Sequence, residues 1–439
     1  MMKEQTYISV NRLLLYRDFE RQQLLDRLCS IVNGYERAAE HPVEREKMIG
    51  ELYACAHELL ELAAGHGFEG NLWHHFLTYL LANHENAFSM ACEIVGEIQG
   101  SLNQAADHDF EIFMQLYRVD FDLVEQALGV RCFAEIGDFE NVDSDRKLFN
   151  RRIRDRIGDL TVKLANAGTV QEFHRHLVSF YKDFGVGKFG LHKAFSVRNI
   201  NGDVHIVPIT NVSHIHFDDL VGYELQKKKL RENTDAFVQG KKANNCLLFG
   251  DAGTGKSSSV KALLNEYYDR GLRMIEVYKH QFQDLPRIIA QLKNRNYYFI
   301  IYMDDLSFEE FEVEYKYLKA VIEGSLEKKP DNVLIYATSN RGHLVREKFS
   351  DKEGRRDDLH ASDTVQEKLS LVSRFGVTIF FVAPDKKEFQ NIVDILAQRS
   401  QLPIDRETLL EEANKWELSH GGLSGRTAQQ FINYLLGQQ

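Results

Sequence analysis

Eight consecutive residues in the second half of the chain restrict its fold more than any other feature. They read Gly250-Asp251-Ala252-Gly253-Thr254-Gly255-Lys256-Ser257 and fit the pattern G-x-x-x-x-G-K-[ST]. An apolar run precedes them, and a stretch compatible with a helix follows from Ser258. Glycines let the backbone curl so that several N–H groups point at phosphate oxygens, and the helix start adds the positive end of its dipole. The motif therefore predicts a phosphate-binding loop between a strand and a helix.

Two side chains at the end of this loop add chemistry to the backbone. Lys256 is a mobile cation suited to the β- and γ-phosphates of a nucleotide, and the Ser257 hydroxyl is suited to ligate Mg²⁺. Ser258, in the first turn of the predicted helix, is assigned to the same phosphate site. The alternative is a chance match in a glycine-containing turn, which the strand–loop–helix context disfavours.

A second predicted strand, 298–303, ends in two carboxylates, Asp304 and Asp305. Ligands bind outside the carboxyl ends of strands in open α/β sheets, so this is where acids of a nucleotide site are expected. We expect Asp304 to hold Mg²⁺ through water and Asp305 to polarise an attacking water. The alternative is a solvated pair of acids that merely caps a strand.

Periodicity divides the chain into an α-helical first half and an α/β second half. Helical spacing of apolar residues runs from about residue 13 to 181, with helices expected over 72–82 and 110–128. After residue 213, short apolar runs alternate with helix-length segments, which is typical of a parallel sheet covered by helices on both faces. The five predicted strands are 246–249, 272–278, 297–303, 333–337 and 377–382.

Glycines at 185, 187 and 190 and a predicted hairpin around Asn201-Gly202 separate the two halves. We therefore predict four segments. They are a helical N-terminal domain (1–183), a hairpin and linker (184–213), a nucleotide-binding core (214–383) and a C-terminal helical lid (384–439).

Composition narrows the functional class. Apolar residues make up 44% of the chain and charged residues 27%, so a large core can be buried. The net charge of −11 disfavours wide non-specific binding to nucleic acid, although it leaves a local basic groove possible. Five scattered cysteines predict reduced thiols, and neither a secretory signal nor a membrane-length apolar run is visible. We expect a cytoplasmic protein that is not bound to a membrane.

At this point the chain resembles the AAA+ ATPases over roughly residues 214–439. Phe217-Asp218-Asp219-Leu220-Val221-Gly222 is similar to the lead-in segment that lines the adenine pocket, and Gly222 is placed there. The strand 333–337, which runs on to Asn340, resembles the sensor-1 strand, in which Asn340 orients the attacking water. Gly422-Leu423-Ser424-Gly425-Arg426 resembles sensor 2, in which Arg426 contacts the nucleotide from the lid.

The same resemblance implies that residues of one subunit complete the site of its neighbour. Ser373-Arg374-Phe375-Gly376 is similar to the arginine-finger segment, so Arg374 would enter a neighbouring site and offset charge in the transition state. Arg341, Arg355 and Arg356 are rival fingers. The implied protein is a homo-oligomer.

More narrowly, two segments are similar to the bacterial domain-of-unknown-function 815 family. They are Asp304-Asp305-Leu306-Ser307-Phe308 and Ala337-Thr338-Ser339-Asn340-Arg341. One departure from many AAA+ members is Asp305, which stands where they have glutamate. Its carboxylate lies one methylene closer to the backbone, so slow hydrolysis is expected.

Other features carry ordinary interpretations. The acidic run 309–314 is expected to be a solvated helix face. His74 and His75 are adjacent, so on a helix they point about 100° apart and are expected to pack rather than to bind a metal. No guanine-recognition motif Asn-Lys-x-Asp is present, which favours adenine.

These observations predict a Mg²⁺-dependent ATPase whose hydrolysis drives conformational change in an oligomer. The domain 1–183 is expected to recognise a client, and we expect this client to be a protein. Three alternatives stay open: a slowly hydrolysing ATP-gated switch, a loader of nucleic-acid machinery, and a P-loop phosphotransferase. Fold and site chemistry alone do not name a biological task.

Overall fold

The structure is a computed structural model that describes residues 7–140, 151–307, 314–323, 330–340 and 372–438. The chain divides into two compact units, Met1–His192 (unit 1) and Lys193–Gln439 (unit 2). None of the described helices is long and apolar enough to cross a membrane.

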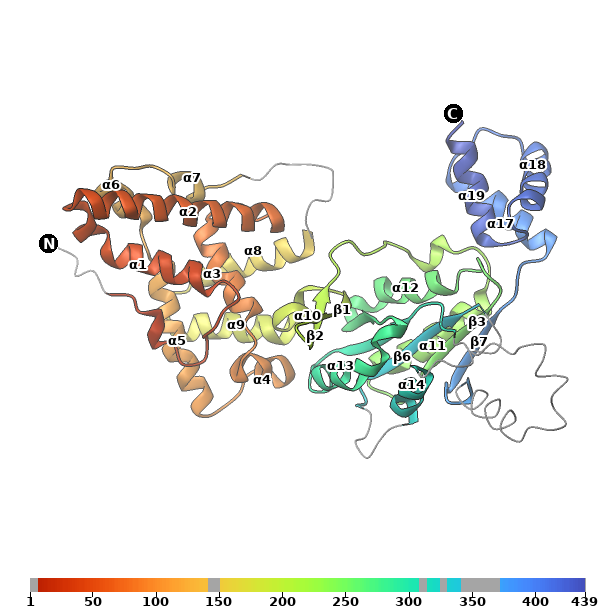
Figure 1. Ribbon diagram of the computed structural model, residues 1–439, viewed down its shortest axis with the longest axis horizontal. Coiled ribbons are helices and arrows are strands. Elements are labelled where there is room, and N and C mark those ends of the chain that lie inside the picture. The colour runs from red at the N-terminus through yellow and green to blue at the C-terminus, as the bar shows by residue number, and fades with distance from the viewer. Residues whose placement is uncertain (1–6, 141–150, 308–313, 324–329, 341–371, 439) are drawn as a thin grey trace. The chain divides into compact units, whose positions relative to one another are not determined.

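Unit 1 is built from helices (Figure 1). The expected helix over 72–82 is confirmed as α3. The region 110–128 is broken in two, because the Asp120 side chain accepts a hydrogen bond from the N–H of Asp122 and so starts a new helix. The described helices of unit 1 are α1 (Gln22–Ala39), α2 (Pro42–His66), α3 (Leu72–Asn83), α4 (Ala87–Val95), α5 (Ser101–Tyr117), α6 (Phe121–Leu128), α7 (Ala134–Gly137), α8 (Arg151–Ala165), α9 (Val170–Phe184) and α10 (Gly187–Leu191).

The core of unit 1 is rich in aromatic residues, and several of its buried polar side chains bond to the chain itself. Asp109 on α5 is fully buried and accepts the backbone N–H groups of Leu14, Leu15 and Tyr16 at 2.8, 2.8 and 3.0 Å. The hydroxyl of Tyr16 lies 3.0 Å from that of Tyr181. These hydrogen bonds thus hold the segment before α1 against the helix bundle, so they have a structural role.

The adjacent histidines of α3 pack as expected. A ring nitrogen of His74 lies 2.8 Å from the carbonyl of Tyr117, and one of His75 lies 3.0 Å from that of Asn71. Burial lowers the pKa of both rings. No cluster of three or more His, Cys, Asp or Glu side chains that could hold a metal ion occurs among the described residues.

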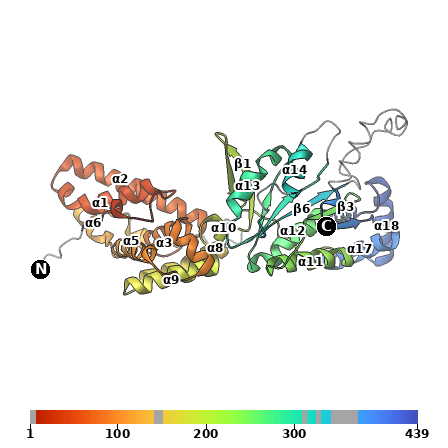
Figure 2. The same ribbon diagram turned by 90° about the horizontal axis from the view of Figure 1, so that it is seen from below.

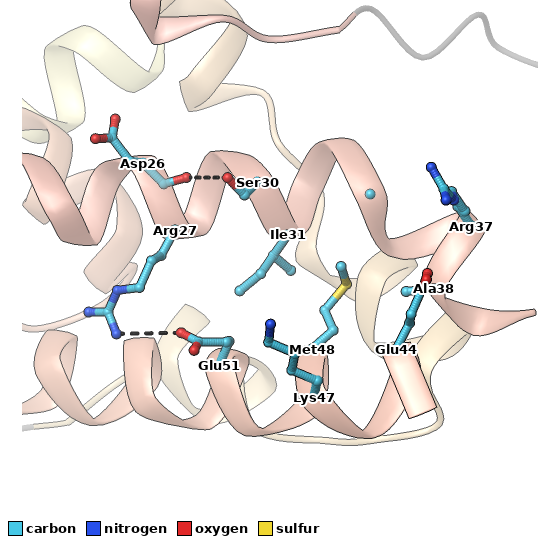
Figure 3. Close-up of a pocket in the computed structure, with 11 residues that line it drawn as sticks. Asp26, Arg27, Ser30, Ile31, Arg37, Ala38, Glu44, Lys47, Met48 and Glu51 are labelled. Carbon is cyan, nitrogen blue, oxygen red and sulfur yellow. Dashed lines mark hydrogen bonds and ion pairs between the residues drawn. The ribbon is translucent and has the colours of Figure 1, made fainter. Parts of the chain in front are cut away.

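A groove lies between α1 and α2 (Figure 3). Ile31 and Met48 line it, and the ion pair of Arg27 with Glu51, at 3.7 Å, lies beside them.

All five cysteines of the chain are free. Four of them are buried, which matches the predicted reduced thiols.

In unit 2 the described strands form one seven-stranded sheet in the order β2-β1-β4-β5-β6-β3-β7. All neighbours are parallel except β1 and β2. The predicted parallel sheet and the five predicted strands are confirmed. The strands are β1 (Ala194–Ile200), β2 (Asp203–Pro208), β3 (Cys246–Gly250), β4 (Leu272–Glu276), β5 (Tyr298–Met303), β6 (Val333–Ser339) and β7 (Val377–Phe381).

The hairpin β1–β2 differs from the linker that the sequence predicted over 184–213. Its strands form around Asn201-Gly202 as expected. However, β1 also pairs in parallel with β4, through Ala194 with Met274 and Phe195 with Ile275, so the hairpin is an edge of the sheet. Helix α10, predicted as linker because of its glycines, belongs to unit 1. The pairing joins segments about eighty residues apart, which local sequence patterns do not reveal.

Helices cover both faces of the sheet and hold its strands in position. Figure 2 shows α11 and α12 on one side and α13 and α14 on the other. A separate apolar core, which includes Phe389, Val393 and Phe431, holds the C-terminal helices together. That these helices act as a lid stays a prediction. The described helices of unit 2 are α11 (Glu224–Val238), α12 (Lys256–Tyr267), α13 (Leu285–Leu292), α14 (Glu314–Glu323), α17 (Lys386–Arg399), α18 (Arg406–Ser419) and α19 (Gly425–Leu436).

Candidate nucleotide-binding site

The loop between β3 and α12 has a backbone that requires glycine. Gly250, Gly253 and Gly255 have φ angles of +131°, +75° and +90°. A Cβ on Gly250 would lie 2.0 Å from the carbonyl oxygen of Phe381, and one on Gly253 would lie 2.7 Å from the Ser424 hydroxyl. The glycines of the motif are thus explained by backbone conformation and by close approach.

The N–H groups of this loop are available to a ligand. From Ala252 to Ser258 they donate to no acceptor in the described part of the chain, whereas the N–H of Asp251 bonds the Phe381 carbonyl at 2.9 Å and that of Ser259 bonds Gly255 at 2.8 Å. A run of unpaired donors at a helix start is an anion site. The residues present therefore fit a phosphate chain.

Lys256 supplies the positive charge of the loop. Its side chain is buried, and its Nζ donates to the carbonyls of Gly250 at 3.0 Å and Asp251 at 2.6 Å. Burial lowers the pKa of Lys256, and the charges of Asp251 and Asp305 offset part of that shift. Carbonyl oxygens now bonded to the ammonium group are weaker partners than phosphate oxygens would be.

The first acid after β5 joins the loop to the neighbouring strand. Asp304 accepts hydrogen bonds on one oxygen, Oδ1, from the Ser257 hydroxyl at 2.7 Å and the Thr338 hydroxyl at 2.5 Å. Burial alone would raise the pKa of Asp304, but the hydroxyls of Thr338, Ser257 and Tyr302, together with the charge of Lys261, lower it overall. Asp304 therefore stays ionised at neutral pH, as a metal ligand must.

The second acid is held in an unusual conformation beside the sensor-like asparagine. Asp305 has a φ angle of +51°, a region that residues other than glycine seldom adopt. Its N–H donates to the Thr338 hydroxyl at 3.0 Å, and the Asn340 side-chain amide donates to its carboxylate at 2.8 Å. The structure thus brings together the two residues assigned by sequence to the attacking water.

The lid touches the loop at one point. The N–H of Arg426, in the first turn of α19, donates to the carbonyl of Gly253 at 3.1 Å. Ser424 caps this helix by accepting from the N–H of Thr427. The exposed side chain of Arg426 is near enough to Lys256 for its charge to lower the lysine pKa further. Loop and lid helix are therefore joined through the backbone.

Residues 190–439, more than half of the chain, match the family described as "Protein of unknown function (DUF815)". The chain belongs to this family. No curated protein matches the chain in sequence. Among solved structures it is similar to two mutants of RuvB from Thermotoga maritima, at 17% and 16% identity and TM-scores of 0.35 and 0.34. Each match covers 50% of this chain and 64% of the RuvB chain, so under two thirds of those proteins is spanned.

The remaining predicted residues of this DUF815 chain lie around the loop or apart from it. Asp251 accepts the N–H of Ala383 at 2.7 Å, which ties the loop to the chain after β7. Gly222 has a φ of +82° and precedes Tyr223, whose hydroxyl donates to the Val382 carbonyl at 2.8 Å. Arg374 is half-buried just before β7, and its assignment to a neighbouring subunit stays a prediction. Arg341, Arg355, Arg356 and most of the acidic run 309–314 lie outside the described residues.

Sequence reasoning missed Thr338 and Tyr302. Thr338 bonds both acids. The buried Tyr302 hydroxyl lies near Asp304, Ser257 and Thr338 but makes no hydrogen bond of good geometry among the described residues, and burial, followed by the charge of Asp304, raises its pKa. The sequence did contain a signal for Thr338, because this residue lies near the end of the same segment, 333–340, that was compared with the sensor-1 strand. Tyr302 gave none, because an aromatic residue in a buried strand usually serves packing alone.

Proposed function

We propose that unit 2 of this DUF815 protein binds ATP with Mg²⁺ and hydrolyses it. One observation carries the proposal. The Ser257 hydroxyl of the phosphate loop is hydrogen-bonded to Asp304 at the end of β5, directly beside seven backbone N–H groups that have no partner within the described residues. This is the donor set that a triphosphate with its metal ion needs.

Each part of the site has a proposed task. The N–H groups and Lys256 hold the phosphates, while Ser257 and Asp304 hold Mg²⁺, whose charge would offset that of the transferred phosphoryl group. Asp305 and Asn340 orient a water for attack. Arg426 contacts the nucleotide from the lid.

The wider proposal concerns coupling. The lid helix α19 is bonded to Gly253 inside the loop, so a phosphate chain that reshapes the loop displaces the lid. We further propose that the protein forms a homo-oligomer in which Arg374 completes a neighbouring site, and that unit 1 recognises a protein client. A cytoplasmic location is part of the same proposal.

The test is phosphate release per subunit with ATP and Mg²⁺ over a wide range of protein concentration. Lys256→Ala should lower turnover on the order of a hundredfold or more, because it removes the charge that faces the phosphates. The matched control is Lys242→Ala, an exposed lysine ahead of β3. Turnover that rises with concentration supports sites shared between subunits, and turnover that survives Lys256→Ala refutes the proposal.

A switch that hydrolyses slowly is the second candidate, and the geometry of Asp305 favours it. Its short carboxylate is already bonded to Asn340, which leaves less freedom to reach a water. Tight ATP binding with almost no phosphate release at any concentration would support the switch. If Asp305→Asn turned over as fast as the unchanged protein, Asp305 would have no part in the reaction. Phosphate transferred to an added acceptor would instead indicate a phosphotransferase.

A further inference from the structure

Thr338, near the end of β6, is buried, and its hydroxyl contacts both acids. This hydroxyl donates to Asp304 Oδ1 at 2.5 Å and accepts the N–H of Asp305 at 3.0 Å. The backbone carbonyl of Thr338 accepts the N–H of Leu306 at 2.6 Å. Through its side chain and its backbone, one residue of β6 therefore contacts three consecutive residues of the turn that follows β5.

The direction of these bonds decides which oxygen of Asp304 is left over. An ionised carboxylate only accepts, so the Thr338 and Ser257 hydroxyls both donate to it. The N–H of Asp305 donates to the same oxygen, Oδ1, at 3.2 Å. Within the described residues no donor has hydrogen-bonding geometry to the other oxygen, Oδ2, and the side chain of Asp304 is exposed. The buried Tyr302 hydroxyl lies near enough to the carboxylate to lower its pKa. Three donors on Oδ1 therefore fix the carboxylate and leave Oδ2 for another partner.

The same threonine stabilises the strained residue. Asp305 is in the left-handed region, which residues with a side chain seldom adopt, aspartate less seldom than most. Such conformations persist only where surrounding contacts impose them. Thr338 supplies contacts on both sides, through the N–H of Asp305 and that of Leu306.

We propose that Thr338 is a positioning residue for the divalent cation of this site. It holds Asp304 so that Oδ2 faces the metal, and it holds the turn so that Asp305 points to Asn340. This rests on the proposed function, because it assigns a role at that same site. Residues that orient metal ligands typically change metal affinity 10- to 100-fold when mutated.

A purely structural threonine is the competing explanation, and the chain offers a matched control for it. Thr234 on α11 is equally buried, and its hydroxyl donates to the Leu230 carbonyl and lies 2.8 Å from the Tyr336 hydroxyl, away from the acids. Thr338→Val and Thr234→Val each delete one buried hydroxyl at nearly constant volume. Both should lower stability, but only the first should alter metal binding.

The experiment measures Mn²⁺ binding to the full-length protein in the presence of ADP, from the loss of the electron paramagnetic resonance signal of free Mn²⁺. Thr338→Val should weaken Mn²⁺ binding on the order of tenfold or more. Thr338→Ser should restore it, and Thr234→Val should leave it unchanged. ADP binding in excess EDTA should be the same for all four proteins. Thr338→Ala replaces Thr338→Val if the valine variant does not fold.

The outcomes distinguish the proposed role of Thr338 from the proposed function, the binding and hydrolysis of ATP, on which it rests. If the unchanged protein takes up neither ADP nor Mn²⁺, the proposed function fails and this role fails with it. If the unchanged protein binds both and Thr338→Val binds Mn²⁺ equally well, only the role of Thr338 is overturned. The same holds if Thr234→Val weakens Mn²⁺ binding as much as Thr338→Val does.

Discussion

Asp109 in unit 1 and Asp304 in unit 2 are both aspartates that accept three hydrogen bonds from their own chain. Asp109 is fully buried and spreads its bonds over both oxygens. Asp304 is exposed and gathers its three bonds on one oxygen. Both oxygens of Asp109 accept hydrogen bonds from the chain, whereas one oxygen of Asp304 is left to bind a ligand.

The difference extends beyond these two residues. In unit 1, polar side chains such as Glu125, which accepts the N–H of Phe133 at 2.6 Å, complete the structure. In unit 2, seven N–H groups and one carboxylate oxygen at the ends of the strands lack partners in the described residues. Buried polar groups are normally satisfied, so a cluster of unsatisfied ones marks a binding site. The comparison predicts that mutations in unit 1 affect stability and those at the site affect turnover.

The largest effect is expected from Asp304→Ala. Loss of a metal ligand should lower ATP turnover on the order of a hundredfold or more, since the metal supplies several kcal/mol of transition-state stabilisation. The free energy of unfolding without nucleotide should fall by less than in Asp109→Ala, because Asp304 is exposed and, of its three donors, only the Thr338 hydroxyl is buried. Phosphate release and urea unfolding of the same preparation measure both. A large loss of stability would show that Asp304 has the same structural role as Asp109 and would contradict the contrast drawn between them.

Asp109→Ala should produce the opposite result. Three backbone N–H groups lose a charged acceptor, which should lower the free energy of unfolding of unit 1 by about 3 kcal/mol. The chain has two tryptophans, Trp73 in unit 1 and Trp416 in the lid, so urea unfolding followed by fluorescence in a Trp416→Phe background reports unit 1. Asp122→Ala, at an exposed position of α6, is the control. Equal unfolding midpoints for both variants would contradict the structural role.

Nucleotide binding should depend on the protonation of Lys256. Its pKa in the folded chain is below 10.5, so between that pKa and 10.5 the folded chain binds fewer protons there than the unfolded chain. In this window its contribution to stability rises with pH while the charge needed by phosphate disappears. Affinity for ADP should therefore fall by about tenfold per pH unit above the lowered pKa. Lys256→Arg should show no such fall, because arginine keeps its proton. Constant affinity up to pH 10.5 would contradict this.

The smallest effect is expected from Tyr302→Phe. Tyr302 and Tyr336 are paired across β5 and β6, and both rings are buried. The Tyr336 hydroxyl bonds Asn233 and Thr234 at 2.8 Å, whereas that of Tyr302 has no partner in the described residues. Thermal unfolding should show Tyr336→Phe destabilised by about 1 kcal/mol and Tyr302→Phe unchanged or slightly stabilised. Equal losses would show that Tyr302 is hydrogen-bonded after all.

Local patterns predicted those parts of the molecule that depend on local rules. The phosphate loop, the five parallel strands and the acids after β5 follow from glycine spacing, apolar runs and the chemistry of strand ends. The edge position of the hairpin did not follow, because β1 finds β4 about eighty residues later. Nor did Thr338, since its importance lies in contacts with Asp304 and Asp305 on another strand. The left-handed conformation of Asp305 was not predicted either, because aspartate tolerates this region better than most residues but adopts it only where its neighbours favour it.

The edge position of the hairpin also has a mechanical consequence. The covalent junction between the units falls at Lys193, whose carbonyl accepts the N–H of Met274 on β4 at 3.0 Å. A pull along β1 loads its hydrogen bonds to β4 and β2 in shear, so that they resist together instead of opening one after another. Strand β4 lies beside β5, which ends at Asp304. Tension at the junction is thus carried by the sheet that holds the acids.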